Sequence, residues 1–156
     1  MIVKAHTLTQ GQPACFREVL SDILEELVEL TWGGSRVECY ERICRSTEEL
    51  DERIEITVRN PSGTLVGFAV IVNDEDDHVG ECLGTQWHWV HPDHRGPVGR
   101  MILRAIIRIA SHAGYKTVAY TKRLGVGRYE INYKQLKENL NGQEDQKGHQ
   151  EGRQDR

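Results

Sequence analysis

The sequence predicts one domain of the α/β class, with a mixed, mostly antiparallel sheet and one parallel β-α-β unit. The chain has 156 residues, and domains typically contain about 100–200 residues. The turn sequence Asn-Pro-Ser-Gly at residues 60–63 joins two strand-like segments, which predicts an antiparallel hairpin. After Pro92 the apolar spacing becomes that of a helix and another strand pattern follows, as in a β-α-β unit. We therefore place this domain at residues 1–136.

The N-terminal half is expected to contain a strand, two helices and the hairpin. Residues 2–9 form a candidate strand, and the next helix ends at Gly33-Gly34. Its apolar face repeats at helical spacing through Phe16, Val19, Leu20, Ile23, Leu24, Leu27 and Leu30. An acidic run on its other side is expected to be a solvated face. Ser-Arg-Val-Glu at residues 35–38 predicts a capping box that opens the second helix. The hairpin strands are expected at residues 54–58 and 65–72.

The C-terminal half is expected to contain three further strands around one helix. The strands are predicted at residues 82–90, 117–121 and 128–136, and the helix at residues 100–113. Arg100, Arg104 and Arg108 form a polar stripe on that helix. Residues 137–156 contain Leu140 as their only large apolar residue, so they are expected to be a disordered polar tail.

Composition and charge restrict the function classes. The formal net charge is −4 without a basic block, which argues against general nucleic-acid binding but permits a small basic site for an anion. Four cysteines without a CxxC pair are expected to be reduced thiols of a cytoplasmic protein. The first residues lack the apolar run of a signal peptide, and no apolar stretch approaches the ~20 residues of a membrane span. A soluble protein is expected.

Two segments carry a motif. Residues 63–70 read Gly-Thr-Leu-Val-Gly-Phe-Ala-Val, and residues 89–103 read Trp-Val-His-Pro-Asp-His-Arg-Gly-Pro-Val-Gly-Arg-Met-Ile-Leu. The second segment resembles the GNAT superfamily, the GCN5-related N-acetyltransferases, whose pattern is roughly V-x-P-x-x-R-G-x-G-x-G-x-x-L. The matching positions are Val90, Pro92, Arg95, Gly96 and Leu103. The order of elements resembles the family over residues 1–121, which implies an acyl-CoA N-acyltransferase fold.

The resemblance implies a binding site for acetyl-CoA as co-substrate. A helix N-terminus offers unpaired N–H groups and the positive end of the helix dipole, and glycines allow a diphosphate to approach closely. In the family these amides hold the pyrophosphate of coenzyme A, and the end of the preceding strand takes the pantetheine arm. The corresponding residues here are Trp89 and Val90 for the arm and Arg95, Gly96, Val98, Gly99 and Arg100 for the diphosphate.

The motif also departs from the family pattern. Val98 and Arg100 occupy the positions of the second and third glycines, Gly99 lies one position away, and Pro97 removes one amide donor. The family's usual ending, an Asn-bearing helix and a Tyr-x-x-x-Gly-Phe segment, is missing after Thr121. The sequence therefore resembles a divergent or truncated member of the family.

The implied reaction moves an acetyl group directly from acetyl-CoA to an amine. An amine with a pKa near 10.4 needs a base or a water chain to remove its proton. Glu81 is the candidate base, and Gln86 could orient a water. The departing thiolate needs an acid, often a tyrosine in this family. The candidates are Tyr129, which we prefer, Tyr120 and Tyr133.

Other interpretations stay open. The chain could be a non-catalytic structural or interaction protein, such as a phage virion component, or a regulator that binds acyl-CoA. His88, His91 and His94 are not expected to bind a metal, because His88 and His91 would face opposite sides of a strand. The acyl acceptor is undefined, and homo-oligomers through exposed strand edges are conceivable.

Overall fold

Six strands form one sheet in their chain order, β1 to β6, and the computed structural model describes residues 1–137. All neighbours are antiparallel except β4 and β5, which are parallel and joined through α3. The strands are β1 (Ile2–Thr9), β2 (Glu52–Arg59), β3 (Leu65–Asp76), β4 (Gly80–Val90), β5 (Thr117–Gly125) and β6 (Arg128–Gln135). The predicted mixed sheet, its hairpin and its β-α-β unit are confirmed.

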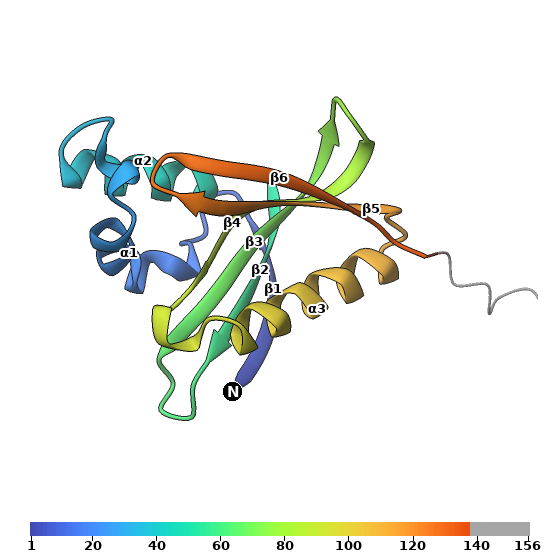
Figure 1. Cartoon of the computed structure of the whole chain (residues 1–156), viewed down its shortest axis with the longest axis horizontal. Helices are drawn as coiled ribbons and strands as arrows, with labels where there is room; N and C mark the ends of the chain where they lie inside the picture. The colour runs from blue at the N-terminus through green and yellow to red at the C-terminus, as the bar shows by residue number, and fades with distance from the viewer. Residues whose placement is uncertain (138–156) are drawn as a thin grey trace, which may run out of the picture.

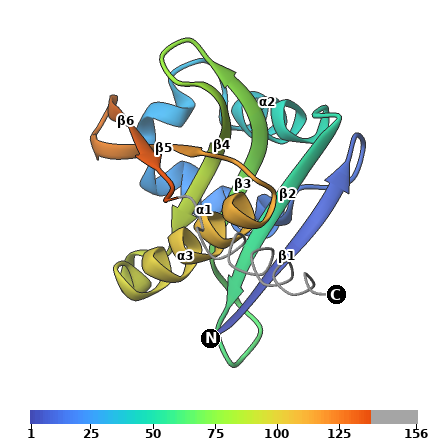
Figure 2. The ribbon, with the colours of Figure 1, turned by 90° about the vertical axis from the view of Figure 1, so that its right-hand side faces the viewer.

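Helices cover both faces of the sheet (Figure 1; Figure 2). One face carries η1 (Cys15–Glu18), α1 (Leu20–Glu26), η2 (Val28–Thr31) and α2 (Arg36–Glu48). The other carries α3 (Pro97–His112), which follows the short η3 (Pro92–His94). Each face has its own buried apolar cluster, one around Phe16 and Phe68 and the other around Ile56 and Ile106. In the part of the chain described, no helix is long and apolar enough to cross a membrane.

The first predicted helix is broken into three pieces. The backbone leaves the helical region at Leu27, with φ −105° and ψ 79°, and α1 contains only seven residues. Of the acidic run that we expected to be solvated, Asp22 is exposed, whereas the other four carboxylates form ion pairs. Glu18 pairs with Arg59, Glu25 with Arg36, Glu26 with Arg95 and Glu29 with Arg123.

The sequence signals for the starts of the other two helices agree with the structure. At α2 the Ser35 side chain accepts from the Glu38 amide at 3.2 Å, and Glu38 accepts from the Ser35 amide at 2.7 Å, which is the predicted capping box. Helix α3 begins at Pro97, where a missing N–H costs nothing. The predicted disordered tail lies, apart from residue 137, outside the described residues, and the boundary at residue 136 stays a prediction.

A buried ion pair fixes the segment that leads into η1. Arg53 and Glu55 on β2 have side chains 0% and 1% exposed and bind each other at 2.8 Å. Arg53 also donates to the carbonyl of Gln12 at 2.6 Å, and Glu55 accepts from the Cys15 amide at 2.8 Å. The pair is satisfied on both sides, as buried charges must be. It holds the chain so that Phe16 enters the core.

Candidate functional site

A slot opens between β4 and β5. The two strands pair only at Leu83 with Val118 and at Gly84 with Ala119. Beyond these pairs, β4 is bonded to β3 alone, so its other edge is free of a strand partner up to Val90. A cavity of about 740 Å³ lies at this divergence, between β4, β5 and the helices of the α1 side. Its size falls in the range of ligand sites, which is roughly 300–1,000 Å³.

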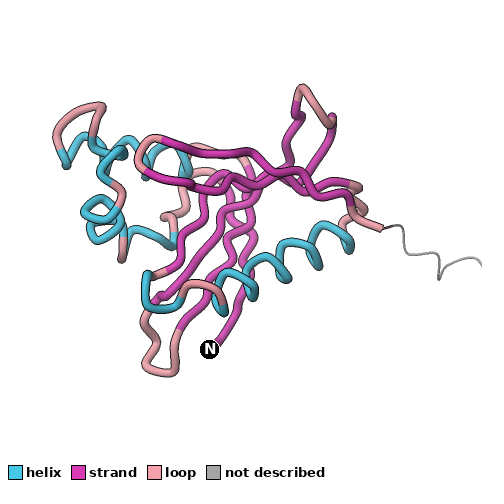
Figure 3. Tube along the Cα trace, viewed as in Figure 1, coloured by secondary structure: helices cyan, strands magenta, loops and turns pink. Residues whose placement is uncertain are grey.

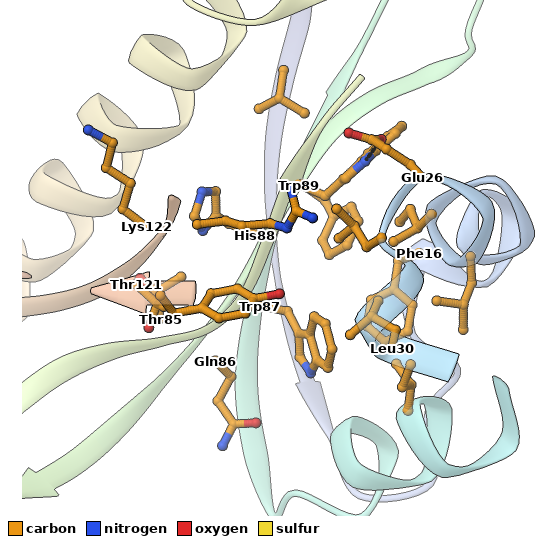
Figure 4. Close-up of a pocket in the computed structure, with 18 of the residues that line it drawn as sticks. Phe16, Glu26, Leu30, Thr85, Gln86, Trp87, His88, Trp89, Thr121 and Lys122 are labelled. Atoms are coloured by element: carbon orange, nitrogen blue, oxygen red, sulfur yellow. Dashed lines mark hydrogen bonds between the residues drawn. The ribbon is translucent and has the colours of Figure 1, made fainter. Parts of the chain in front are cut away.

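A β-bulge in β4 decides which side chains face each side of the slot. Val70 pairs with Trp87 and Ile71 with Thr85, so Gln86 is an extra residue in the strand. In a regular strand, Leu83 and Trp87 would share a face, because side chains alternate. Here Leu83 packs in the cluster on the α3 side, whereas Trp87 and Trp89 pack on the α1 side. Figure 4 shows His88 and Lys122 across from Trp87, Phe16 and Leu30.

The wall on the α1 side is aromatic and ends in a carboxylate. Phe16 lies 5.2 Å from Phe68 and 6.3 Å from Trp87, measured between ring centroids. Trp89 is 7% exposed, and its Nε1 donates to Glu26 Oε2 at 2.9 Å. The other oxygen of Glu26 binds the Arg95 guanidinium. Glu26 therefore joins α1 to the end of β4 and to the loop before α3.

The tip of the β5–β6 hairpin is fastened to η2, and we call this contact the hairpin latch. Arg123 donates to both Glu29 oxygens at 2.5 and 3.1 Å, and the Tyr129 hydroxyl donates to Glu29 Oε1 at 2.8 Å. The Trp32 ring lies against Gly127 so closely that an added Cβ would be 2.8 Å from it. Figure 3 shows the tip reaching the helices of the α1 side.

The latch shifts the acidity of its members. Hydrogen bonding from Arg123, assisted by Tyr129, lowers the pKa of Glu29 to about 2 despite partial burial. Burial, together with the bond to Glu29, raises the pKa of Tyr129. The latch therefore contains a carboxylate and a protonated phenol at neutral pH.

The N-terminus of α3 offers free amides beside the slot. Gly96 caps the helix with φ 85°, and its carbonyl accepts from the Arg100 amide at 3.0 Å. Within residues 1–137, the amides of Val98 and Gly99 have no acceptor. An added Cβ at Gly99 would meet nothing within 4 Å. These groups form a small, approachable site for an anion.

The structure brings most predicted site residues together. Trp89, Val90, Arg95, Gly96 and Tyr129 line the cavity, and Gln86 does as well. Val98, Gly99 and Arg100 lie in the adjoining first turn of α3. The Val98 side chain is buried in the core, so only its amide faces outward. The Arg95 guanidinium is paired with the carboxylate of Glu26 on α1.

The candidate base and two of the candidate acids lie outside the cavity. Glu81 is at the opposite end of β4, in register with Glu75 near the β3–β4 turn, and it does not line the cavity. Of the other tyrosines, Tyr133 donates to Asp76 at 3.0 Å, and Tyr120 packs against the cluster on the α3 side. Tyr129 is therefore the candidate acid that reaches the cavity.

Sequence reasoning missed several cavity residues. Glu26, Glu29, His88, Lys122 and Arg123 all line it. His88 is exposed to the cavity, but loss of hydration lowers the pKa of its imidazole, which is therefore neutral at pH 7. Glu26 and Glu29 were visible in the sequence as part of the acidic run. Their partners could not be inferred, because Arg95 lies 69 residues after Glu26 and Arg123 lies 94 residues after Glu29.

The three histidines are distributed over different places. His91 and His94 have ring centroids 5.6 Å apart before α3, whereas His88 lies in the slot. In residues 1–137, no three His, Cys, Asp or Glu side chains gather in a way that could hold a metal ion.

Solved structures share this architecture. A complex of AAC(6′)-Iy with the bisubstrate analogue CoA-S-monomethyl-acetylneamine has a TM-score of 0.54 at 15% identity, covering 80% of this chain and 82% of that one. The ribosomal-protein-alanine N-acetyltransferase from Brucella melitensis biovar Abortus 2308 has 0.51 at 14%, covering 77% and 79%. The aminoglycoside 6′-N-acetyltransferase AAC(6′)-IG from Acinetobacter haemolyticus has 0.51 at 16%, covering 80% and 81%. At these identities the similarity shows the fold alone.

No curated protein matches the sequence. The sequence model of the acetyltransferase (GNAT) family does match it, over residues 20–127. That span runs from α1 to the tip of the β5–β6 hairpin and includes the slot and the first turn of α3. The chain therefore belongs to the acetyltransferase (GNAT) family.

Proposed function

We propose that the protein is an N-acyltransferase that moves an acetyl group from acetyl-CoA to an amine. The observation that carries the proposal is the open slot between β4 and β5, which leads to free amides at the start of α3. A thioester with a phosphate-bearing arm fits such a slot, because the arm can bond to a free strand edge and the phosphates to a helix N-terminus.

The residues present fit that donor. The amides of Val98 and Gly99, with the guanidinium of Arg100, would hold the diphosphate. The open space at Gly99 leaves room for it. The backbone of Trp89 and Val90 would bond to the pantetheine arm, and Lys122 on the opposite strand adds a positive charge. An acyl-CoA supplies an activated acyl group on sulfur.

The acceptor would enter from the α1 side. Trp87 and Phe16 line that wall with apolar side chains, and an amine there would share the carboxylates of Glu26 and Glu29 with Arg95 and Arg123. AAC(6′)-Iy and the Brucella enzyme bear names of amine acetyltransferases, which supports an amine acceptor of unspecified identity.

The chain's own groups would then move the protons. His88, neutral at pH 7, would accept the proton that the attacking nitrogen loses. It takes the role expected of Glu81, which lies outside the cavity. A free N–H on the β4 edge would stabilise negative charge on the acyl oxygen as the C–N bond forms and the C–S bond breaks. Tyr129 would return a proton to the departing sulfur.

Thermal unfolding with acetyl-CoA tests the proposal. Binding to the folded state alone raises the midpoint as the ligand concentration passes Kd. We expect Arg100→Glu to weaken binding by about 1–3 kcal/mol, the size of a lost charge-assisted hydrogen bond plus repulsion. Arg45→Glu on α2 is the matched control, because Arg45 is exposed and lies outside the cavity. A midpoint that does not move at millimolar acetyl-CoA would refute the proposal.

Turnover tests the proton transfers separately. We expect His88→Ala to reduce kcat while the affinity for acetyl-CoA stays unchanged. Because the pKa of His88 is lowered, the acidic limb of the pH–rate profile should lie below the usual histidine value of about 6.5. Tyr129→Phe should also reduce kcat alone, if its hydroxyl reprotonates the sulfur.

A non-catalytic role is the second candidate. Arg95 is occupied by Glu26, and the Tyr129 hydroxyl by Glu29, so two family positions already have partners within the chain. Absence of both acetyl-CoA binding and turnover would favour this interpretation.

A further inference from the structure

The outer face of α3 is a ridge of positive charge. Arg100, Arg104 and Arg108 are all exposed and follow one another every four residues. Successive members are therefore about 6 Å apart along the helix axis. The sixteen residues of α3 contain no aspartate or glutamate. We call these three side chains the arginine ridge.

The ridge arginines differ from most other arginines of the protein in having no acceptor for their side chains among the described residues. Residues 1–137 contain twelve arginines. Seven of them bind a carboxylate or a backbone carbonyl within the chain, namely Arg17, Arg36, Arg42, Arg53, Arg59, Arg95 and Arg123. In the described residues, no acceptor binds the side chains of the ridge arginines, Arg45 or Arg128. Three of these five unsatisfied guanidinium groups thus stand in one row.

Apolar side chains accompany the ridge. Leu103 and Ile107 are half-buried, and neither belongs to the two core clusters. They lie four residues apart, so they share one flank of α3 beside the arginines. A row of guanidinium groups next to two apolar side chains matches an acidic amphipathic helix, whose carboxylates also repeat at about 6 Å. A nucleic-acid backbone would use the charges but not the apolar flank.

The ridge starts at the end of the slot that lies beside the free amides of α3. Arg100 belongs to the first turn of α3, and Gly96 before it lines the cavity. The ridge continues away from that turn for about 12 Å, from Arg100 to Arg108. It therefore offers charge well beyond the amides that would hold a diphosphate.

We propose that the arginine ridge docks an acidic carrier protein that brings its acyl group on a phosphopantetheine arm. The proposal rests on the proposed function, since it names a second source of the same thioester. The arm would enter the slot as that of coenzyme A does, with its single phosphate at the start of α3. The acyl carbon leaves sulfur for the acceptor nitrogen, and the carrier keeps a free thiol that takes the proton the nitrogen loses.

Calorimetry with a small acidic acyl carrier protein, acetylated on its phosphopantetheine thiol, tests this docking. We expect R104E/R108E to weaken binding of this probe by about tenfold or more, and added salt to weaken binding to the wild type. The control is R45E/R128E, which makes the same charge change at the other two unsatisfied arginines. L103A/I107A should weaken binding as well, by several-fold.

The binding measurements can overturn the docking proposal in several ways. Equal affinity of wild type and R104E/R108E for the carrier, or no binding to the wild type, overturns the proposal. Equal losses in R104E/R108E and R45E/R128E also overturn it, because they would reflect net charge alone. Binding of a 20-bp DNA duplex that depends on the ridge while the carrier fails would assign the ridge to nucleic acid instead. Acetyl-CoA, titrated in parallel, separates the two questions: its binding should survive R104E/R108E, and its failure to bind wild type would count against the proposed function.

Discussion

Gly67 on β3 lies directly against the first turns of α3, so a substitution there tests how α3 is seated on the sheet. An added Cβ at Gly67 would lie 2.6 Å from Val98 Cγ1 and 3.1 Å from Ile102 Cδ1. Carbon atoms are best separated by about 3.5–4.0 Å. Gly67→Ala must therefore move the start of α3 outward by roughly 1 Å, or force its side chains out of their rotamers.

The size of the effect follows from two opposing terms. Overpacking a close-packed core costs about 1–3 kcal/mol. Replacing glycine by alanine recovers about 0.4–1 kcal/mol by restricting the unfolded chain. We therefore expect Gly67→Ala to reduce the free energy of unfolding by roughly 1–2 kcal/mol. For a domain of this length that lowers the thermal midpoint by about 2–8 °C.

Urea unfolding followed by tryptophan fluorescence measures the change in the free energy of unfolding, with two further variants as controls. Gly99→Ala makes the same chemical change on α3, but an added Cβ there meets nothing within 4 Å. It should be neutral or stabilising by up to about 1 kcal/mol, as expected for alanine in place of a helical glycine. Val98→Ala removes the nearest clashing methyl, so the double variant with Gly67→Ala should be more stable than the sum of the single effects predicts.

Two results would refute the reasoning. One is a cost for Gly67→Ala no larger than that for Gly99→Ala. The other is strict additivity of Gly67→Ala and Val98→Ala, because residues in direct steric conflict must couple. Gly99→Ala also reports on the donor site: it should weaken acetyl-CoA binding while leaving the fold stable, if the diphosphate occupies the space beside Gly99.

Two other groups give measurable consequences. The pKa of Glu29 is lowered from 4.5 to about 2, so its contribution to stability is complete above about pH 4.5 and is lost as the pH falls toward 2. Glu29→Gln should lower the thermal midpoint by about 2–4 °C at pH 7, and the difference from wild type should shrink near pH 2; a constant difference would contradict the latch. Burial and the neighbouring Glu55 carboxylate raise the pKa of the Cys15 thiol, so iodoacetamide at pH 8 should leave Cys15 unmodified in the native protein and alkylate it after unfolding. Mass spectrometry of the alkylated peptides measures this, and rapid native labelling of Cys15 would contradict it.

The features that the sequence predicted correctly are those set by neighbouring residues. The capping box needs only Ser35 and Glu38, and the hairpin needs only its turn at residues 60–63. The change of apolar period after Pro92 identified α3, and the parallel pairing of β4 with β5 then followed from the β-α-β rule. The motif around Arg95 and Gly96 was sufficient to find the family.

The features that it did not predict depend on partners far along the chain. Helical periodicity from Phe16 to Leu30 is continuous, yet the backbone breaks at Leu27. Glu26 and Glu29, on either side of that break, bind Arg95 and Arg123. Nothing local distinguishes these carboxylates from solvated ones such as Asp22. Likewise, Glu81 and His88 are both polar residues on β4, and only the position of the slot separates them.

The two walls of the slot are held by contacts of different kinds, and this difference determines what can change its width. The β4 wall is paired with β3 along its length, and α3 is seated against Gly67 beneath it. The β5–β6 wall pairs with β4 at only two positions, so beyond Ala119 its position depends on the latch at Glu29. A side chain from η2 on the α1 side therefore sets the width of the slot at this end. Opening the latch would move the β5–β6 wall and leave the amides of α3 in place, because they belong to the other wall.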